Sequence, residues 1–239
     1  RRGGEKDKSK TIPQDSISKF DSIILPGDTI PTPSDIYGPG KSVLRVNPIL
    51  LIDKKSTLPK GSLRSKIGVP REAILCYLQL GAGRINEINS EIRYTVDALL
   101  DIPGVIILIG ESLLGERIDY SHPRVRILRE YPNALYYEDM DFAIIAGGYN
   151  SFHEVLEHNI PSICFPNMNT GRDDQLARCV VARDAGCMIL VKNRNRRTIK
   201  AAVNRIANSD TREKMSNNCS ILSRPNGSIE VASWISKSL

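Results

Sequence analysis

From residue 70 onward, the chain alternates between short apolar runs and longer amphipathic segments. Strand-length runs predict β-strands at residues 73–80, 105–109, 125–128, 142–146, 162–165 and 188–191. Helical periodicity predicts helices at residues 87–100, 151–158, 173–185, 198–208, 210–222 and 228–239. Runs that are apolar at every position are typical of parallel strands buried on both faces. The pattern therefore predicts an α/β fold, a Rossmann-like parallel sheet with helices on both faces.

The first 69 residues lack this alternation. A strand-like run at residues 22–25 is followed by a stretch rich in Pro, Gly, Asp and Ser that indicates a loop. A second extended stretch covers residues 43–52, and residues 58–68 predict a short helix closed by a glycine. We therefore predict that residues 1–69 are the end of an N-terminal domain and a linker, and that residues 70–239 form the Rossmann-like domain.

The composition is that of an ordinary globular protein. With 41% hydrophobic and 25% charged residues, the chain is unlike disordered, collagen or coiled-coil proteins. Basic residues outnumber acidic ones by 33 to 27, and half of that excess lies in the first ten residues. Nucleic-acid binding is not expected, because aromatic residues make up only 5% of the chain and do not interleave with a basic face.

The cysteines and histidines form no recognisable ligand pattern. The five cysteines are widely spaced, and none of their pairs has zinc-finger or redox spacing. We therefore predict reduced, buried thiols in a cytoplasmic protein, and no metal site. No apolar run approaches the ~20 residues that a membrane-spanning helix needs.

Four predicted loops follow strands of the sheet, at the edge where open α/β sheets bind ligands. The first contains Gly81, Gly83 and Arg84. Its glycines let the backbone approach a ligand, and its arginine can face a phosphate. A tight strand-to-helix turn explains the same residues equally well. The third glycine of the dinucleotide fingerprint is absent, which argues against NAD.

The second loop contains Gly147 and Gly148, followed by Asn150 and Ser151 at the predicted start of a helix. We predict an N-cap at Asn150 and Ser151, with free amides suited to a diphosphate. Glu154 lies about one turn further, where a carboxylate can accept hydrogen bonds from the two hydroxyls of a ribose. From its position alone, however, Glu154 is better explained as a capping-box partner of Ser151 or as a charge that complements the helix dipole.

The third and fourth loops offer side chains suited to a sugar and to a base. Asp174 and Gln175 combine a carboxylate and an amide, the groups that sugar hydroxyls need as partners. Helix capping by Asp173, with Gln175 on the surface, is an equally good explanation. Arg129 and Tyr131 follow a short strand, in a position where either side chain can stack on a base.

The order of these pieces resembles the C-terminal, donor-binding half of GT-B glycosyltransferases. Residues 141–156 form an apolar strand, a Gly-Gly loop and a helix that contains a glutamate. A second strand ends at Pro166, and the pair Asp174-Gln175 and then Ala185-Gly186 follow. The resemblance covers roughly residues 70–225. It is greatest to the branch with the peptidoglycan N-acetylglucosaminyltransferase and the plant galactolipid synthases.

The resemblance assigns each candidate residue to one part of a nucleotide sugar. Residues expected at the diphosphate are Gly147, Gly148, Asn150 and Ser151, with Gly81, Gly83 and Arg84 near them. Residues expected at the ribose and the base are Glu154, Arg129 and Tyr131. Asp174 and Gln175 are expected at the sugar. The chain departs from the family at Tyr149 or Asn150, where a serine or threonine is common.

The resemblance implies a glycosyltransferase that moves a hexose or N-acetylhexosamine from a UDP-sugar to an acceptor hydroxyl. No metal and no cofactor besides the donor substrate is expected. In such enzymes an N-terminal domain binds the acceptor and usually supplies the catalytic base. Both are therefore expected outside this chain, either on a longer protein or on a partner subunit, as in the two-subunit transferase of the dolichol pathway.

The same resemblance leaves the cellular location and two other functions open. The expected location is cytoplasmic, and peripheral association with a membrane surface is compatible with this branch. A UDP-sugar epimerase or hydrolase of the same fold is one alternative. A non-catalytic nucleotide-sugar-binding subunit of a two-chain transferase is the other.

Overall fold

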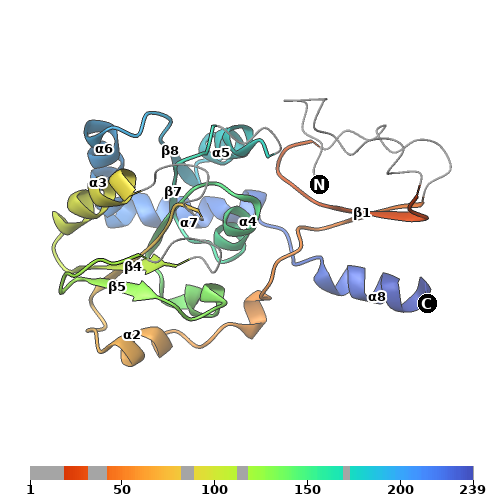
Figure 1. The fold of residues 1–239 in the computed structure, drawn as a ribbon, viewed down its shortest axis with the longest axis horizontal. Coiled ribbons are helices and arrows are strands. Elements are labelled where there is room, and N and C mark those ends of the chain that lie inside the picture. Colours follow the sequence, from red (N-terminus) through yellow and green to blue (C-terminus); the bar gives the residue numbers. More distant parts are fainter. Residues whose placement is uncertain (1–18, 32–41, 82–88, 112–117, 169–172, 239) are drawn as a thin grey trace.

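The computed structural model describes residues 19–31, 42–81, 89–111, 118–168 and 173–238. Its main element is a six-stranded sheet with strand order β5-β4-β3-β6-β7-β8 (Figure 1). The strands are β3 (Ile74–Gln79), β4 (Val105–Gly110), β5 (Val125–Leu128), β6 (Phe142–Ile145), β7 (Ser162–Cys164) and β8 (Met188–Leu190). Every neighbouring pair is parallel, so the predicted Rossmann-like sheet is confirmed.

Helices pack on both faces of this sheet, which explains why its strands are apolar throughout. One face is covered by α3 (Asn89–Leu100) and α6 (Arg196–Ala207). The other is covered by α2 (Ser62–Ile67), the 3₁₀ helix η4 (Asn133–Asp139), α4 (Tyr149–Glu157) and α5 (Gln175–Asp184). The helix α7 (Ser209–Leu222) contributes to both cores. Because side chains alternate along a strand, Cys76 and Leu78 enter the first core and Tyr77 enters the second.

The N-terminal segment forms a separate small sheet at one end of the molecule. There β1 (Ser22–Pro26) pairs in parallel with β2 (Ser42–Val46). The last helix, α8 (Ser228–Ser238), extends toward the same end (Figure 1). The Asn226 side chain accepts a hydrogen bond from the Leu50 amide (3.0 Å) and donates one to the Leu50 carbonyl (3.2 Å). The segment after β2 is therefore joined to the segment before α8.

Most predicted elements are present, with changes of a few residues at their ends. The predicted short helix near residue 60 is α2, and it ends as expected at Gly68, which has a left-handed φ of +65°. The helix η4 was missed, because seven residues in a 3₁₀ helix are too few to show the periodicity of an α-helix. The extended stretch predicted for residues 43–52 forms a strand only as far as Val46.

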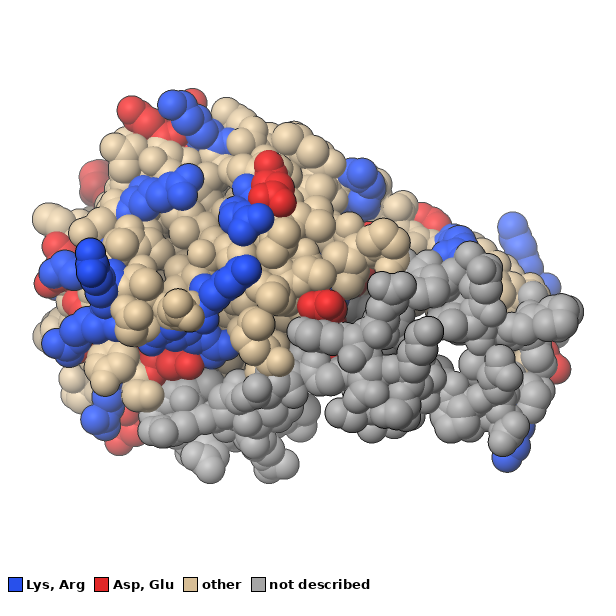
Figure 2. All heavy atoms as spheres, turned by 90° about the horizontal axis from the view of Figure 1, so that it is seen from above, with Lys and Arg blue, Asp and Glu red and all other residues tan. Residues whose placement is uncertain are grey.

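Acidic and basic side chains are mixed on the face that carries α3 and α6, at the left of Figure 2. Three ion pairs connect α6 or the loop before it with α3 or the residue after it: Arg194 with Glu91 (2.6 Å), Arg196 with Asp97 (3.2 Å) and Lys200 with Asp101 (2.9 Å). The basic run before α6 is therefore partly neutralised by acids of α3. In the described ranges, no helix combines the length and the apolar composition that a membrane crossing requires.

Candidate functional site

A cavity of about 400 Å³ lies at the carboxyl end of β3, beside the start of α4. The chain places β4 and β5 on one side of β3, and it places β6, β7 and β8 on the other. The loops after β3 and β6 therefore diverge, which is the position where open α/β sheets bind their ligands. Four of the predicted site residues line this cavity: Tyr131, Asn150, Ser151 and Glu154.

The lining of this cavity does not include the predicted residues Gly81, Arg129, Gly147, Gly148, Asp174 and Gln175. Arg129 is exposed, and its guanidinium pairs with the Glu111 carboxylate (3.1 Å) instead of pointing into the cavity. Gly81 follows β3 with a left-handed φ of +95°, as a tight turn requires. Gly83 and Arg84 lie outside the described residues.

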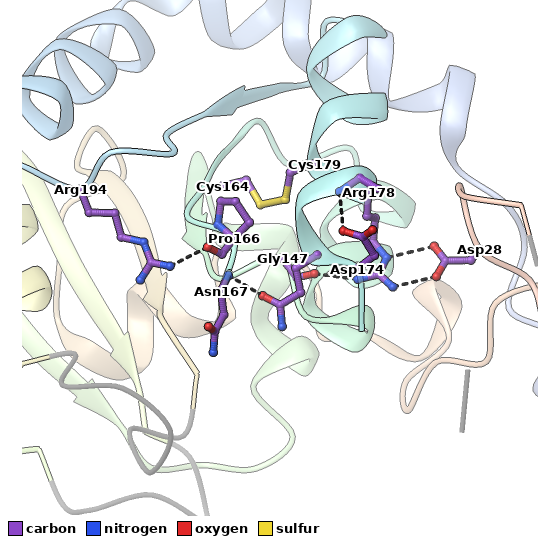
Figure 3. Close-up of a disulfide and its surroundings, with 11 residues drawn as sticks. Asp28, Gly147, Cys164, Pro166, Asn167, Asp174, Arg178, Cys179 and Arg194 are labelled. Carbon is purple, nitrogen blue, oxygen red and sulfur yellow. Dashed lines mark hydrogen bonds and ion pairs between the residues drawn. A yellow bond between two sulfur atoms is a disulfide. The ribbon is translucent and has the colours of Figure 1, made fainter. Parts of the chain in front are cut away.

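The glycine turn before α4 is fixed by both backbone conformation and packing. Gly147 has a φ of +75°, and a Cβ atom there would lie 2.6 Å from Cys179 Sγ and 2.8 Å from Cys164 Sγ. These two cysteines form a disulfide directly behind the turn (Figure 3). The prediction of reduced thiols is wrong for this pair. Although the two cysteines are 15 residues apart in sequence, the strand–loop–helix unit that carries them brings their Cα atoms to 6.4 Å.

The helix α4 begins earlier than the sequence suggested. Its N-cap is Gly148, with no capping side chain, so the predicted N-cap at Asn150 and Ser151 is wrong. The glycine turn already directs the chain into the helix at Tyr149. The first amides of α4 are therefore those of Tyr149, Asn150 and Ser151. These amides and the positive end of the helix dipole make this turn suited to an anion.

Glu154 is a partly buried acid in the wall of the cavity, and it lies beyond the first turn of α4. The capping-box alternative fails, because the Ser151 hydroxyl donates to Gln79 Oε1 (2.9 Å). Burial raises the pKa of Glu154 to about 7, although a hydrogen bond from Tyr137 counteracts part of this effect. The site therefore holds a carboxyl group that can change its ionisation near neutral pH.

Three buried polar side chains behind Glu154 were missed by sequence reasoning. Tyr137 bonds to Glu154 and to Tyr77, and Asn133 Nδ2 donates to the Tyr77 hydroxyl (3.1 Å). The network depends on Gly110, since a Cβ atom there would lie 2.5 Å from that hydroxyl. The only signal in the sequence was a tyrosine in the middle of a mostly apolar strand.

The start of α5 lies against the glycine turn. Asp174, and not Asp173, is the N-cap of α5, and it accepts a hydrogen bond from the Ala177 amide (3.1 Å). Gln175 is buried instead of exposed, and its Oε1 accepts from the Asn167 amide (2.9 Å). Its Nε2 lies 4.0 Å from the position of a Cβ atom on Gly148. The starts of α4 and α5 therefore converge at one place, as the sequence argument required.

The described part of the chain holds no group of three or more His, Cys, Asp or Glu side chains placed to bind a metal ion. The arrangement instead combines helix amides, one partly buried carboxyl and an exposed tyrosine around a cavity. These groups can hold a phosphate-containing ligand through the amides and vicinal hydroxyls through the carboxylate.

Comparison with protein families and solved structures gives a consistent result. The model described as "Glycosyltransferase family 28 C-terminal domain" matches residues 104–230. Among curated proteins, no match is found. The glycotransferase of kitacinnamycin is 19% identical, with a TM-score of 0.59 over 87% of this chain and 52% of that one. The calicheamicin glycosyltransferase CalG4 is 16% identical, with a TM-score of 0.58 over 82% of this chain and 48% of that one.

A further solved structure contains a nucleotide. The spinosyn rhamnosyltransferase SpnG, complexed with thymidine diphosphate, is 16% identical, with a TM-score of 0.57 over 85% of this chain and 57% of that one. At such low identity, these likenesses show the fold. The chain spans about half the length of each of these solved structures.

Proposed function

The chain belongs to glycosyltransferase family 28, and from this premise we propose that the cavity beside β3 and α4 binds the nucleotide-sugar donor of a glycosyl transfer. The donor is a UDP-sugar, and a hexose or N-acetylhexosamine passes from it to an acceptor hydroxyl. The observation that supports this proposal most is the convergence of the α4 and α5 starts beside a cavity that contains Glu154.

Each group of the site has a role in this proposal. The first amides of α4 bind the diphosphate, and they stabilise its charge when it leaves without a bound metal. Ionised Glu154 accepts hydrogen bonds from the two ribose hydroxyls. Tyr131 and Leu51, both exposed at the cavity, contact the faces of the base. Gln175 and Asp174 lie nearest to the transferred sugar.

The acceptor and the catalytic base belong to the proposed N-terminal half, on a longer chain or on a partner subunit. The likeness of the candidate loops to the peptidoglycan N-acetylglucosaminyltransferase branch favours an N-acetylhexosamine donor. A thymidine-diphosphate sugar is the second candidate donor, because SpnG, part of which is similar in fold, was solved with thymidine diphosphate.

Calorimetric titration with UDP, UDP-N-acetylglucosamine, UDP-glucose, thymidine diphosphate and NAD tests the proposal. Saturable binding of the UDP compounds, without binding of NAD, is expected. If only thymidine diphosphate binds, the proposed donor changes from a UDP-sugar to a thymidine-diphosphate sugar, and the proposed site is unchanged. Binding of NAD, together with indifference to both nucleoside diphosphates, would contradict the proposed function.

Donor binding is expected to weaken below pH 7. Burial raises the pKa of Glu154 to about 7, and only the ionised form accepts hydrogen bonds from both ribose hydroxyls. The affinity for UDP should therefore fall by up to about tenfold per pH unit below this pKa and level off above it. The measurement is the Kd of UDP between pH 5.5 and 8.5.

Glu154→Gln is the control, because the diphosphate of the ligand itself titrates at about pH 6. The variant should retain only the pH dependence of the ligand. Identical pH profiles for the wild type and the variant would show that Glu154 does not titrate at the donor.

Tyr131→Ala is expected to weaken the binding of nucleosides and nucleoside diphosphates alike. Stacking of a base on an aromatic ring contributes about 1–3 kcal/mol, so a loss of about tenfold is expected. Because Tyr131 is 59% exposed, folding should be little affected. Tyr94→Ala is a matched control, since Tyr94 is an exposed tyrosine of α3 that does not line the cavity. An equal response of both variants would exclude stacking on Tyr131.

A further inference from the structure

A buried arginine lies behind the glycine turn without lining the donor cavity. The side chain of Arg178 on α5 is 0% exposed. Its Nη1 donates to the Gly147 carbonyl (2.9 Å), and its Nη2 donates to Asp173 Oδ1 (2.7 Å). One guanidinium group therefore holds the backbone before α4 and the loop before α5 (Figure 3).

The partner of this arginine comes from the N-terminal segment. Asp28 follows β1 and accepts from Arg178 Nε (3.0 Å) and Nη2 (2.7 Å) in a two-pronged contact (Figure 3). Its Oδ1 also lies 3.2 Å from His153 Nε2 on α4. Burial alone would raise the pKa of Asp28, but the bonds from His153 and Arg178 hold it well below its usual range. Asp28 is therefore an anion at neutral pH.

A second contact ties the same segment to the first residue of α4. The Tyr149 hydroxyl donates to the Gly27 carbonyl (2.8 Å) and accepts from the Ile49 amide (3.4 Å). The Arg178 guanidinium also lies 5.7 Å from the centre of the Tyr149 ring. The turn after β1 thus fixes both helix starts that frame the cavity, although it is more than 100 residues away in sequence.

Fold stability alone does not require this cluster of charges. A buried ion pair often contributes no more to stability than well-packed apolar side chains of similar volume. An apolar pair, however, has no donor for the Gly147 carbonyl. The planar guanidinium reaches that carbonyl and two carboxylates at fixed angles, which lysine cannot do.

We propose that Arg178, oriented by Asp28, is a positioning residue that sets the glycine turn and the start of α5 for the donor diphosphate. This inference rests on the proposed donor site. It assigns a part of diphosphate recognition to a residue that does not touch the ligand, and it makes the N-terminal segment a component of the donor site.

The test compares diphosphate binding with nucleoside binding. The first variant is Arg178→Lys. Because a single change leaves buried charges without their full set of partners, the second variant is the double replacement Asp28→Leu with Arg178→Met, which removes both charges. Arg64→Lys is the matched control, because Arg64 is also a buried arginine. It donates to the Ala73 carbonyl just before β3, at the amino end of that strand and away from the cavity at its carboxyl end.

Calorimetry measures the Kd of UDP, and ligand-observed NMR measures the weaker binding of uridine. Both Arg178 variants should bind UDP about tenfold to 100-fold more weakly, because misplaced binding groups lose affinity steeply. Uridine, which is held by Glu154 and Tyr131, should bind within about twofold of the wild-type Kd. The Arg64 control should retain both affinities.

Two results overturn the inference alone: variants that bind UDP as well as the wild type does, or variants that lose uridine and UDP to the same extent. A wild-type chain that binds no nucleoside diphosphate overturns the proposed function and this inference with it. The two failures are distinguished by the wild-type titration.

Discussion

Replacing Glu154 with alanine is expected to weaken UDP binding at least about 100-fold, because two hydrogen bonds to a charged group, each about 1.5–3 kcal/mol, are lost. Glu154 lines the cavity, and the hydrogen bond from Tyr137 restricts the orientation of its carboxylate. Calorimetry at pH 8, where the wild-type carboxyl is mostly ionised, measures the difference in Kd. Transfer activity of the assembled enzyme should fall at saturating acceptor for the same reason.

The matched control is Glu157→Ala. Glu157 lies one helical turn further along α4, is partly buried, and does not line the cavity. Its replacement should change the Kd by no more than about twofold. Burial raises the pKa of Glu154 from its ordinary 4.5 to about 7, so its ionisation lowers stability as the pH rises between these two values. Loss of the Glu154 charge should therefore not lower Tm at pH 8. Equal losses of affinity in both variants would remove Glu154 from the donor site.

Gly147→Ala is expected to lower the free energy of unfolding by about 2–5 kcal/mol. The left-handed backbone accounts for about 1–2 kcal/mol, and the overlap of the new methyl group with two sulfur atoms accounts for about 1–3 kcal/mol. The displaced turn should also bind UDP more weakly. Urea denaturation measures the first effect and calorimetry the second.

Gly104→Ala separates the two causes. Gly104 has a φ of +70°, close to that of Gly147, but no atom lies within 4 Å of the position of its Cβ. Its replacement should lower the free energy of unfolding by the backbone contribution alone, about 1–2 kcal/mol, and leave UDP binding intact. An equal loss of stability in the two variants would show that packing against the cysteines adds nothing.

The fold could be predicted because its signal is local. Strands buried on both faces are apolar at every position, and β4 and β6 show this within a few residues. The glycine turn and Glu154 could also be found, since they follow β6 in a fixed order. That Glu154 is partly buried and not fully solvated could not be predicted, because its environment is made by η4 and β3.

The remaining features of the site depend on contacts between distant segments. Tyr77 and Tyr137 have the pattern of core residues, and they form a polar network only because β3 and η4 are adjacent. Asp28 and Arg178 are 150 positions apart, so no local pattern connects them. The disulfide was missed because its two cysteines do not have the short spacing of a redox motif.

Amide chemical-shift mapping tests the central claim most directly, because it locates the bound ligand on the chain. The isotope-labelled protein is titrated with UDP, and the shift of each assigned amide is followed. The account predicts that the largest changes lie at the α4 start (Gly147, Gly148, Asn150 and Ser151) and at Gln175. Changes concentrated around residues 60–71, near the amino end of β3, would contradict it, and so would the absence of any saturable change.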